Sequence, residues 1–129
     1  KGGVLYCAAP NDYSPIQIQA VKKLGLPHYW LAPPMHLFYN TPKMLQLCVR
    51  RCGFKILDFY GTYPLDQALL KGENYISHPE LGREVHRRRM ADELRVVEQG
   101  RWHKRRAEYR RNLAAHRAGR EIVLVAQKQ

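Results

Sequence analysis

The sequence predicts an α/β fold with a small mixed sheet, flanking helices and a basic helical insertion. The run 122–126 contains five consecutive apolar residues, which indicates a strand that is covered on both faces. A nearly continuous apolar run over 4–9 predicts a second strand, and 54–63 predicts a third that carries Lys55 and Asp58. Charged residues within a strand favour an edge position. The buried last strand therefore fits between the other two.

Length and composition predict one globular unit. The chain has 129 residues, 45% hydrophobic residues and a mean hydropathy of -0.52. These values exclude a disordered tail and an integral membrane protein. The cysteines Cys7, Cys48 and Cys52 are odd in number and lie among apolar neighbours, which indicates reduced core thiols in a cytoplasmic protein without a signal peptide. The strand at 4–9 has almost no polar lead-in, so we expect the chain to be part of a larger domain.

Two helices have clear start and stop signals. Ser14-Pro15 is typical of a helix start and Gly25 of a helix end. The second helix begins at Thr41-Pro42 and ends before Gly53. Its expected apolar stripe consists of Met44, Leu45, Cys48, Val49 and Cys52. Between the two helices, 26–40 contains three prolines and four aromatic residues without a period, so it is expected to be a structured loop.

The segment 72–118 predicts a long helical insertion between the edge strand and the central strand. Its apolar residues recur at helical spacing and are Leu81, Val85, Leu94, Val97, Trp102, Tyr109 and Leu113. Gly100 marks the expected break between two helices. The stretch 83–120 holds 13 basic and 5 acidic residues, and so carries +8 of the formal net charge of +11. Such a field attracts anions, although an arginine-rich helical surface is often only a solvated face.

Several short motifs along the chain share their order and spacing with a known family. They are Gly2-Gly3, Pro10-Asn11-Asp12, Pro34, His36, Tyr39, the Thr41-Pro42 helix that runs into Gly53-Phe54, the stretch 72–76, Gly82, His86, Arg89, Glu93 and the stretch 119–122. Together they resemble the C-terminal half of class I S-adenosylmethionine-dependent methyltransferases, in a branch that acts on small molecules. The resemblance spans nearly the whole chain. It implies a partial Rossmann-like methyltransferase sheet in which the final strand is antiparallel and lies in the middle.

The cofactor-binding motif of that family is missing from this sequence. Family members hold S-adenosylmethionine with a Gly-rich loop after the first strand and an acidic residue at the end of the second. Here Lys1-Gly2-Gly3 precedes a strand instead. The resemblance therefore implies a parent methyltransferase of which this chain is the substrate-side part. Its partners would be the N-terminal half of the same domain and a small-molecule methyl acceptor. We expect the isolated chain to be inactive and to bind S-adenosylmethionine with a dissociation constant above about 100 μM.

The candidate site lies where the first strand ends, because ligands of open α/β sheets bind beyond the carboxyl ends of parallel strands. This rule places Asn11, Asp12, the loop 29–39 and Tyr63 around one mouth. His36 is the candidate catalytic base, since an imidazole with a pKa of about 6.5 accepts a proton near neutrality. A histidine that is hydrogen-bonded within its loop is the alternative. The candidate substrate-binding residues are Asn11, Trp30, Tyr39 and Tyr63. Capping of the turn by Asn11 and packing of the loop by the aromatic residues are the alternatives for these.

Catalytic motifs of other enzyme classes are absent from the sequence. Cys48 and Cys52 lie one helical turn apart, but no second Cys or His pair has ligand spacing, so no metal site is expected. There is also no Gly-x-Ser-x-Gly, no phosphate-binding Gly-Lys-Ser/Thr loop and no His-Glu-x-x-His. A serine hydrolase, a nucleotide hydrolase and a zinc protease are therefore not indicated.

A nucleic-acid-binding module is the alternative from another functional class. Basic residues at 87–89, 104–106 and 110–111 are interleaved with Trp102 and Tyr109, a composition that suits phosphate contacts and base stacking. No named RNA- or DNA-binding motif accompanies them. Self-association of the parent enzyme into a homo-oligomer through the same basic helices is a third interpretation. No membrane partner is expected.

Overall fold

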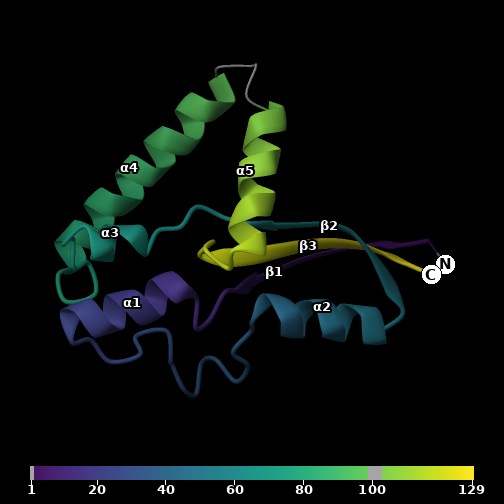
Figure 1. Cartoon of the computed structure of the whole chain (residues 1–129), viewed down its shortest axis with the longest axis horizontal. Coiled ribbons are helices and arrows are strands. Elements are labelled where there is room, and N and C mark those ends of the chain that lie inside the picture. Colours follow the sequence, from purple (N-terminus) through teal and green to yellow (C-terminus); the bar gives the residue numbers. More distant parts are fainter. Residues whose placement is uncertain (1, 99–102) are drawn as a thin grey trace.

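The computed structural model describes residues 2–98 and 103–129 and shows a mixed α/β arrangement (Figure 1). In chain order the elements are β1 (Val4–Pro10), α1 (Pro15–Leu24), α2 (Pro42–Arg51), β2 (Phe54–Gly61), α3 (Gln67–Leu70), α4 (Pro79–Glu98), α5 (His103–Ala115) and β3 (Glu121–Lys128). The predicted α/β class, the three predicted strands and the two capped helices are confirmed. The short helix α3 was not predicted.

The last strand of the chain lies in the centre of the sheet. The strand order is β1-β3-β2, and β3 pairs antiparallel with both neighbours. Leu124 of β3 lies opposite Cys7 of β1 and opposite Phe59 of β2. Because both outer strands are antiparallel to β3, they run in the same direction as each other. The predicted central position of the last strand and edge position of β2 are confirmed.

The central strand is buried on both faces. Ile122, Val123 and Leu124 are at most 1% exposed, so consecutive side chains on opposite faces are all covered. On one face, Leu45 and Val49 of α2 pack against β3. On the other side of the sheet α5 packs along β2, and Figure 1 shows α2 and α5 on opposite sides. The unbroken apolar run in the sequence therefore reflects this two-sided cover.

The two helices with sequence signals are capped as expected. The Ser14 side chain accepts a hydrogen bond from the Gln17 amide, and the Gln17 side chain accepts one from the Ser14 amide, which completes a capping box at α1. The helix ends at Gly25 in the left-handed region, with φ of 63°. Thr41 caps α2 by accepting from the Met44 amide. These local bonds fix where the loop 26–40 begins and ends.

Two glycines let the start of β3 lie against the end of β2. A Cβ atom added at Gly119 would lie 2.8 Å from Gly61 Cα and 2.9 Å from the Thr62 nitrogen. These contacts are backbone contacts, so no side-chain movement would relieve them. Only glycine permits this close approach. It brings the chain that leaves β2 beside the chain that enters β3.

The predicted core position is wrong for Cys48 and Cys52, whereas Cys7 packs against the core cluster. Cys48 and Cys52 are exposed, Cys7 is only partly buried, and all three are free thiols. The apolar stripe of α2 is wider than the surface it covers, because only Leu45 and Val49 of that stripe are buried against the three-stranded sheet. The sulfur-bearing side chains of the same stripe, Met44, Cys48 and Cys52, are exposed.

One face of β1 is also more exposed than its apolar sequence indicates. Its residues alternate between exposed and partly buried, and Val4 and Tyr6 are 66% and 63% exposed. No helix of the described residues packs over that face of β1, because α5 lies over β2.

The basic insertion is helical, as predicted. Figure 1 shows α4 and α5 on the side of the sheet opposite α2. Between them, α4 ends at Glu98 and α5 begins at His103, so the expected break at Gly100 and the side chain of Trp102 lie outside the described residues. No helix in the part of the chain that the structure describes is long and apolar enough to cross a membrane.

Candidate functional site

A pocket of about 220 Å³ lies at the carboxyl end of β1. We call it the β1 pocket; its lining residues are Pro10, Asp12, Gln17, Tyr29, Trp30, Ala32, His36, Arg120 and Glu121. They come from the end of β1, the first turns of α1, the loop 26–40 and the start of β3. The pocket therefore lies at the position that the strand-end rule predicted, and it brings His36 and Trp30 together.

Asp12 forms the buried acidic wall of this pocket and is 2% exposed. Its Oδ2 accepts from the Asn40 amide at 2.8 Å, while its own amide donates to the Asn40 carbonyl at 2.9 Å. Burial raises the pKa of the Asp12 carboxyl; the Asn40 hydrogen bond and the nearby His36 and Arg120 act in the opposite direction. A carboxyl whose charge is disfavoured takes up a proton more readily than a solvated one, and this carboxyl lies near the imidazole of His36.

His36 is exposed on the outer side of the pocket. Its backbone amide donates to the Ala32 carbonyl at 3.0 Å, which places the residue in a tight turn of the loop. The imidazole lies close enough to Asp12 for their charges to interact. A carboxyl beside an imidazole at the wall of a cavity is an arrangement that general acid–base chemistry uses.

A network around Asp66 holds the opposite wall. The Asp66 side chain is 3% exposed and accepts from Arg120 Nη1 at 3.0 and 3.1 Å through its two oxygens. It also accepts from the hydroxyls of Tyr29 (3.0 Å) and Tyr75. Burial, followed by the negative charge of Asp66, raises the pKa of both tyrosine hydroxyls well above the usual range. The network therefore fixes Tyr29 and Arg120, two residues of the pocket wall.

Trp30 is largely packed against other rings, and part of it lines the β1 pocket. It is 5% exposed, stacks on His28 with ring centroids 4.8 Å apart, and meets the edges of Tyr13 and Tyr29 at 5.4 and 5.1 Å. Among the described residues its Nε1 has no hydrogen-bond partner. The ring contributes an apolar surface to the pocket, and its packing fixes the loop.

Asn11 and Tyr39 hold the backbone in place near the pocket without lining it. The Asn11 Nδ2 donates to the carbonyls of Arg117 and Gly119 at 2.9 and 2.8 Å. The Tyr39 hydroxyl accepts from the Ala32 amide at 3.2 Å. Both predicted substrate-binding residues thus have structural contacts, and neither faces the β1 pocket in this structure.

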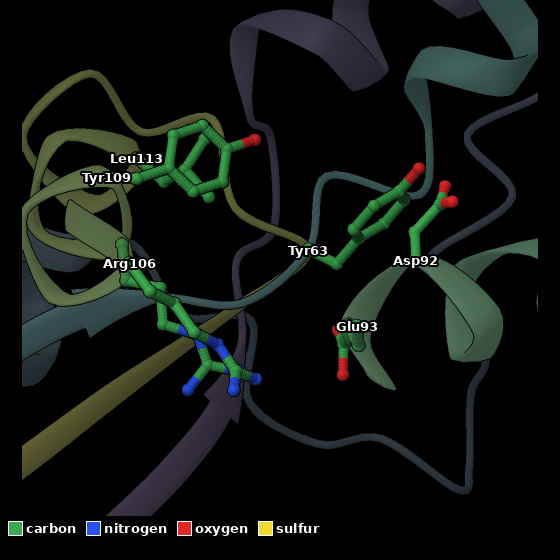
Figure 2. Close-up of a pocket in the computed structure, with 7 residues that line it drawn as sticks. Tyr63, Asp92, Glu93, Arg106, Tyr109 and Leu113 are labelled. Carbon is green, nitrogen blue, oxygen red and sulfur yellow. The ribbon is translucent and has the colours of Figure 1, made fainter. Parts of the chain in front are cut away.

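The predicted placement of Tyr63 beside His36 is wrong. The Thr62 amide donates to the Glu121 carbonyl at 3.0 Å, and the chain then continues toward the basic helices. Tyr63 lines a separate cavity of about 120 Å³ between α4 and α5. Figure 2 shows its ring beside Asp92 of α4, with Glu93 of α4 and Arg106 of α5 lining the same cavity.

Comparison of the chain with protein-family models, with curated protein sequences and with solved structures gave no match. The site is therefore assigned on geometry and chemistry alone.

Many arginines of the basic helices have carboxylate partners. Ion pairs join Arg87 to Glu84, Arg88 to Glu73, Arg89 to Glu93 at 3.3 Å and Arg111 to Asp58 at 2.9 Å. The guanidinium of Arg110 lies 5.6 Å from the ring centroid of Tyr60. These contacts reduce the positive field available to a phosphate backbone. No group of three or more His, Cys, Asp or Glu side chains suited to a metal ion occurs among the described residues.

Proposed function

We propose that this chain is the substrate-side part of a class I S-adenosylmethionine-dependent methyltransferase that acts on a small-molecule acceptor. The observation that carries the proposal is the β1 pocket, in which Asp12, His36 and the Trp30 ring meet at the end of a strand. The strand order β1-β3-β2 supports it, because the family that the sequence resembles ends its sheet with an antiparallel strand in the middle.

Methyl transfer is an in-line displacement, so the protein has mainly to position the acceptor. In this proposal the acceptor lies in the β1 pocket against Trp30 and Tyr29, and the Asp66 network keeps that wall rigid. His36 takes the proton that an acceptor hydroxyl or amine loses. Asp12 stabilises the imidazolium that results, since a nearby carboxylate favours its charged form.

The residues present do not form a site for S-adenosylmethionine. The turn after β1 leads into α1, whose amino end is closed by the capping box of Ser14 and Gln17. No Gly-rich loop offers free amides there. The methyl donor therefore has to be bound by a different part of the parent enzyme, and this chain supplies the acceptor pocket.

The free edge of β1 supports the proposed partner. Among the described residues β1 pairs only with β3, so the outer edge of seven residues, Val4–Pro10, is unpaired. It carries no charged residue, and Val4 and Tyr6 are exposed. A long uncharged edge is a template for another strand. We assign this edge to the N-terminal, cofactor-binding half of the same domain.

The test is a methyl-transfer assay of the native parent protein with labelled S-adenosylmethionine and a panel of hydroxyl- and amine-bearing acceptors. If His36 is the base, His36→Gln lowers turnover about 10²- to 10⁴-fold. The matched control is His116→Gln, because His116 is exposed and lines neither the β1 pocket nor the cavity at Tyr63. Equal turnover of the two variants would remove His36 from the mechanism, and no transfer to any acceptor would refute the proposed function.

The nucleic-acid-binding alternative is not favoured. Its arginines at 87–89 and 111 have carboxylate partners, and Trp102 lies outside the described residues. Oligonucleotide affinity that falls steeply with salt is the result that would revive it.

A further inference from the structure

A second and larger hollow lies at the free edge of β2, between α2 and α5. It has a volume of about 550 Å³. We call it the α2–α5 groove and define it by Lys43, Arg50, Phe59, Arg111, Ala114 and Arg117. It shares no lining residue with the β1 pocket, and none of its described lining residues is acidic.

Three of the four cations in this groove lack a carboxylate partner. Arg111 is neutralised by Asp58, which accepts from its Nε and Nη2 at 2.9 and 3.1 Å. Arg50 donates only to the neutral amide of Gln46, at 3.2 Å, and Arg117 to a backbone carbonyl, at 3.3 Å. Lys43 has no hydrogen-bond or ion-pair partner in the part of the chain that the structure describes. An uncompensated positive charge of this size favours an anionic ligand.

The amino end of α2 strengthens the positive field in the groove. Pro42 has no amide hydrogen, and the Met44 amide donates to Thr41 Oγ1. Among the described residues of the first turn, Lys43 is thus the one whose backbone amide remains available to a ligand. A helix amino terminus carries a partial positive charge, which adds to the charges of the side chains.

The apolar part of the groove indicates that the ligand is more than an inorganic ion. Phe59 is half-buried, and Ala114 is 3% exposed; both line the groove beside the cations. The volume falls within the range of about 300 to 1,000 Å³ that is typical of small-molecule sites. We propose that the α2–α5 groove binds a small organic phosphate. Lys43, Arg50 and Arg117 hold the phosphate group, and the uncharged body lies against Phe59.

This site is independent of the proposed methyl transfer, so direct binding tests it. The ¹⁵N-labelled chain is titrated with phenyl phosphate and with adenosine 5′-monophosphate at low ionic strength, and amide shifts are followed by NMR. Inorganic phosphate serves as the control for the phosphate group of both esters, and phenol and adenosine serve as the controls for their uncharged bodies. We expect the largest shifts at Lys43 and at the residues around Ala114 and Arg117. We also expect each phosphate ester to bind at least about tenfold more tightly than either of its parts.

Arg50→Gln and Arg51→Gln form a matched pair of variants. Both residues are exposed in the last turn of α2, but only Arg50 lines the groove. Arg50→Gln should weaken ester binding at least about fivefold, because a charge-assisted contact is lost. Arg51→Gln should leave it within about twofold. Equal weakening by both changes would mean that general charge attracts the ligand and would overturn the site. Absence of shifts at the groove amides with both esters up to about 10 mM would also overturn it, and so would an oligonucleotide that binds equally well to both variants.

Discussion

Replacement of Asp66 by Asn should destabilise the fold by about 3 kcal/mol. The substitution keeps the side-chain shape but removes the negative charge to which Tyr29, Tyr75 and Arg120 donate. Loss of one partner of a buried ion pair costs about 3 to 5 kcal/mol. The Arg120 side chain is 35% exposed, so water compensates part of its lost interaction. The NH₂ group of the new Asn side chain also faces the hydroxyl and guanidinium groups that donate to Asp66 in the native chain. This contact between donors is unfavourable and offsets the gain from water.

The assay is urea unfolding followed by circular dichroism, with the free energy of unfolding taken from linear extrapolation. A loss of about 3 kcal/mol corresponds to a melting temperature lower by roughly 10 °C for a chain of this size. The control is Asp92→Asn, because Asp92 is an exposed carboxylate on α4 without an ion-pair partner among the described residues. It should change stability by less than about 0.5 kcal/mol. If both variants lose the same free energy, the Asp66 network does not stabilise the fold and the reasoning fails.

Three further predictions concern pH and packing. Burial raises the pKa of the Asp12 carboxyl in the folded state, so ionisation of this carboxyl destabilises the fold once the pH exceeds the unfolded-state pKa of about 3.9. Asp12→Asn should therefore stabilise the fold at pH 7, and the gain should disappear below about pH 4. The hydroxyls of Tyr29 and Tyr75 have raised pKa values, so their protonated forms stabilise the fold fully below about pH 10 and this stabilisation is lost as pH rises further. Absorbance at 295 nm should show that these two hydroxyls ionise only when the chain unfolds. Gly119→Ala should cost more than about 2 kcal/mol, since its Cβ would clash with the backbone of Gly61.

Each of these has a direct check. Chemical unfolding at pH 4 and pH 7 measures the effect at Asp12, and a loss of stability at pH 7 would contradict it. A single ionisation step for all tyrosines near pH 10 in the folded chain would contradict the prediction for Tyr29 and Tyr75. For the third, the control is Gly3→Ala, because a Cβ there meets no atom within 4 Å. Equal stability of the two alanine variants would show that the backbones at Gly61 and Gly119 can separate without cost.

The elements that the sequence predicted are those whose signals are local. The caps of α1 and α2 depend on residues three or four positions apart, and the central strand on five consecutive residues. The direction of β3 came from the family resemblance, since burial alone fixes its place in the sheet and leaves its direction open. The position of the β1 pocket followed from a general rule for strand ends.

The parts that were missed depend on contacts between distant segments. Asp66 gains its role only when Tyr29, Tyr75 and Arg120 converge on it, and its apolar sequence neighbours do not reveal which partners it will have. The exposure of Cys48 depends on how far the sheet extends beneath α2, which the helical stripe does not reveal. Likewise, the direction that the chain takes after β2 placed Tyr63 with the basic helices.

The loop 26–40 is hydrogen-bonded to the rest of the fold near its two ends, whereas large side chains in its middle are exposed. Tyr29 is tied to Asp66, and Asn40 to Asp12, while Met35, Leu37 and Phe38 are 78 to 85% exposed. Substitutions at the ends disturb the fold, whereas substitutions in the middle cost little stability because their side chains leave few contacts behind. The residues on either side of His36 can therefore diverge in sequence without unfolding the domain, and His36 itself lines the β1 pocket. This gives the fold a route to new ligand preferences through a few neighbouring positions.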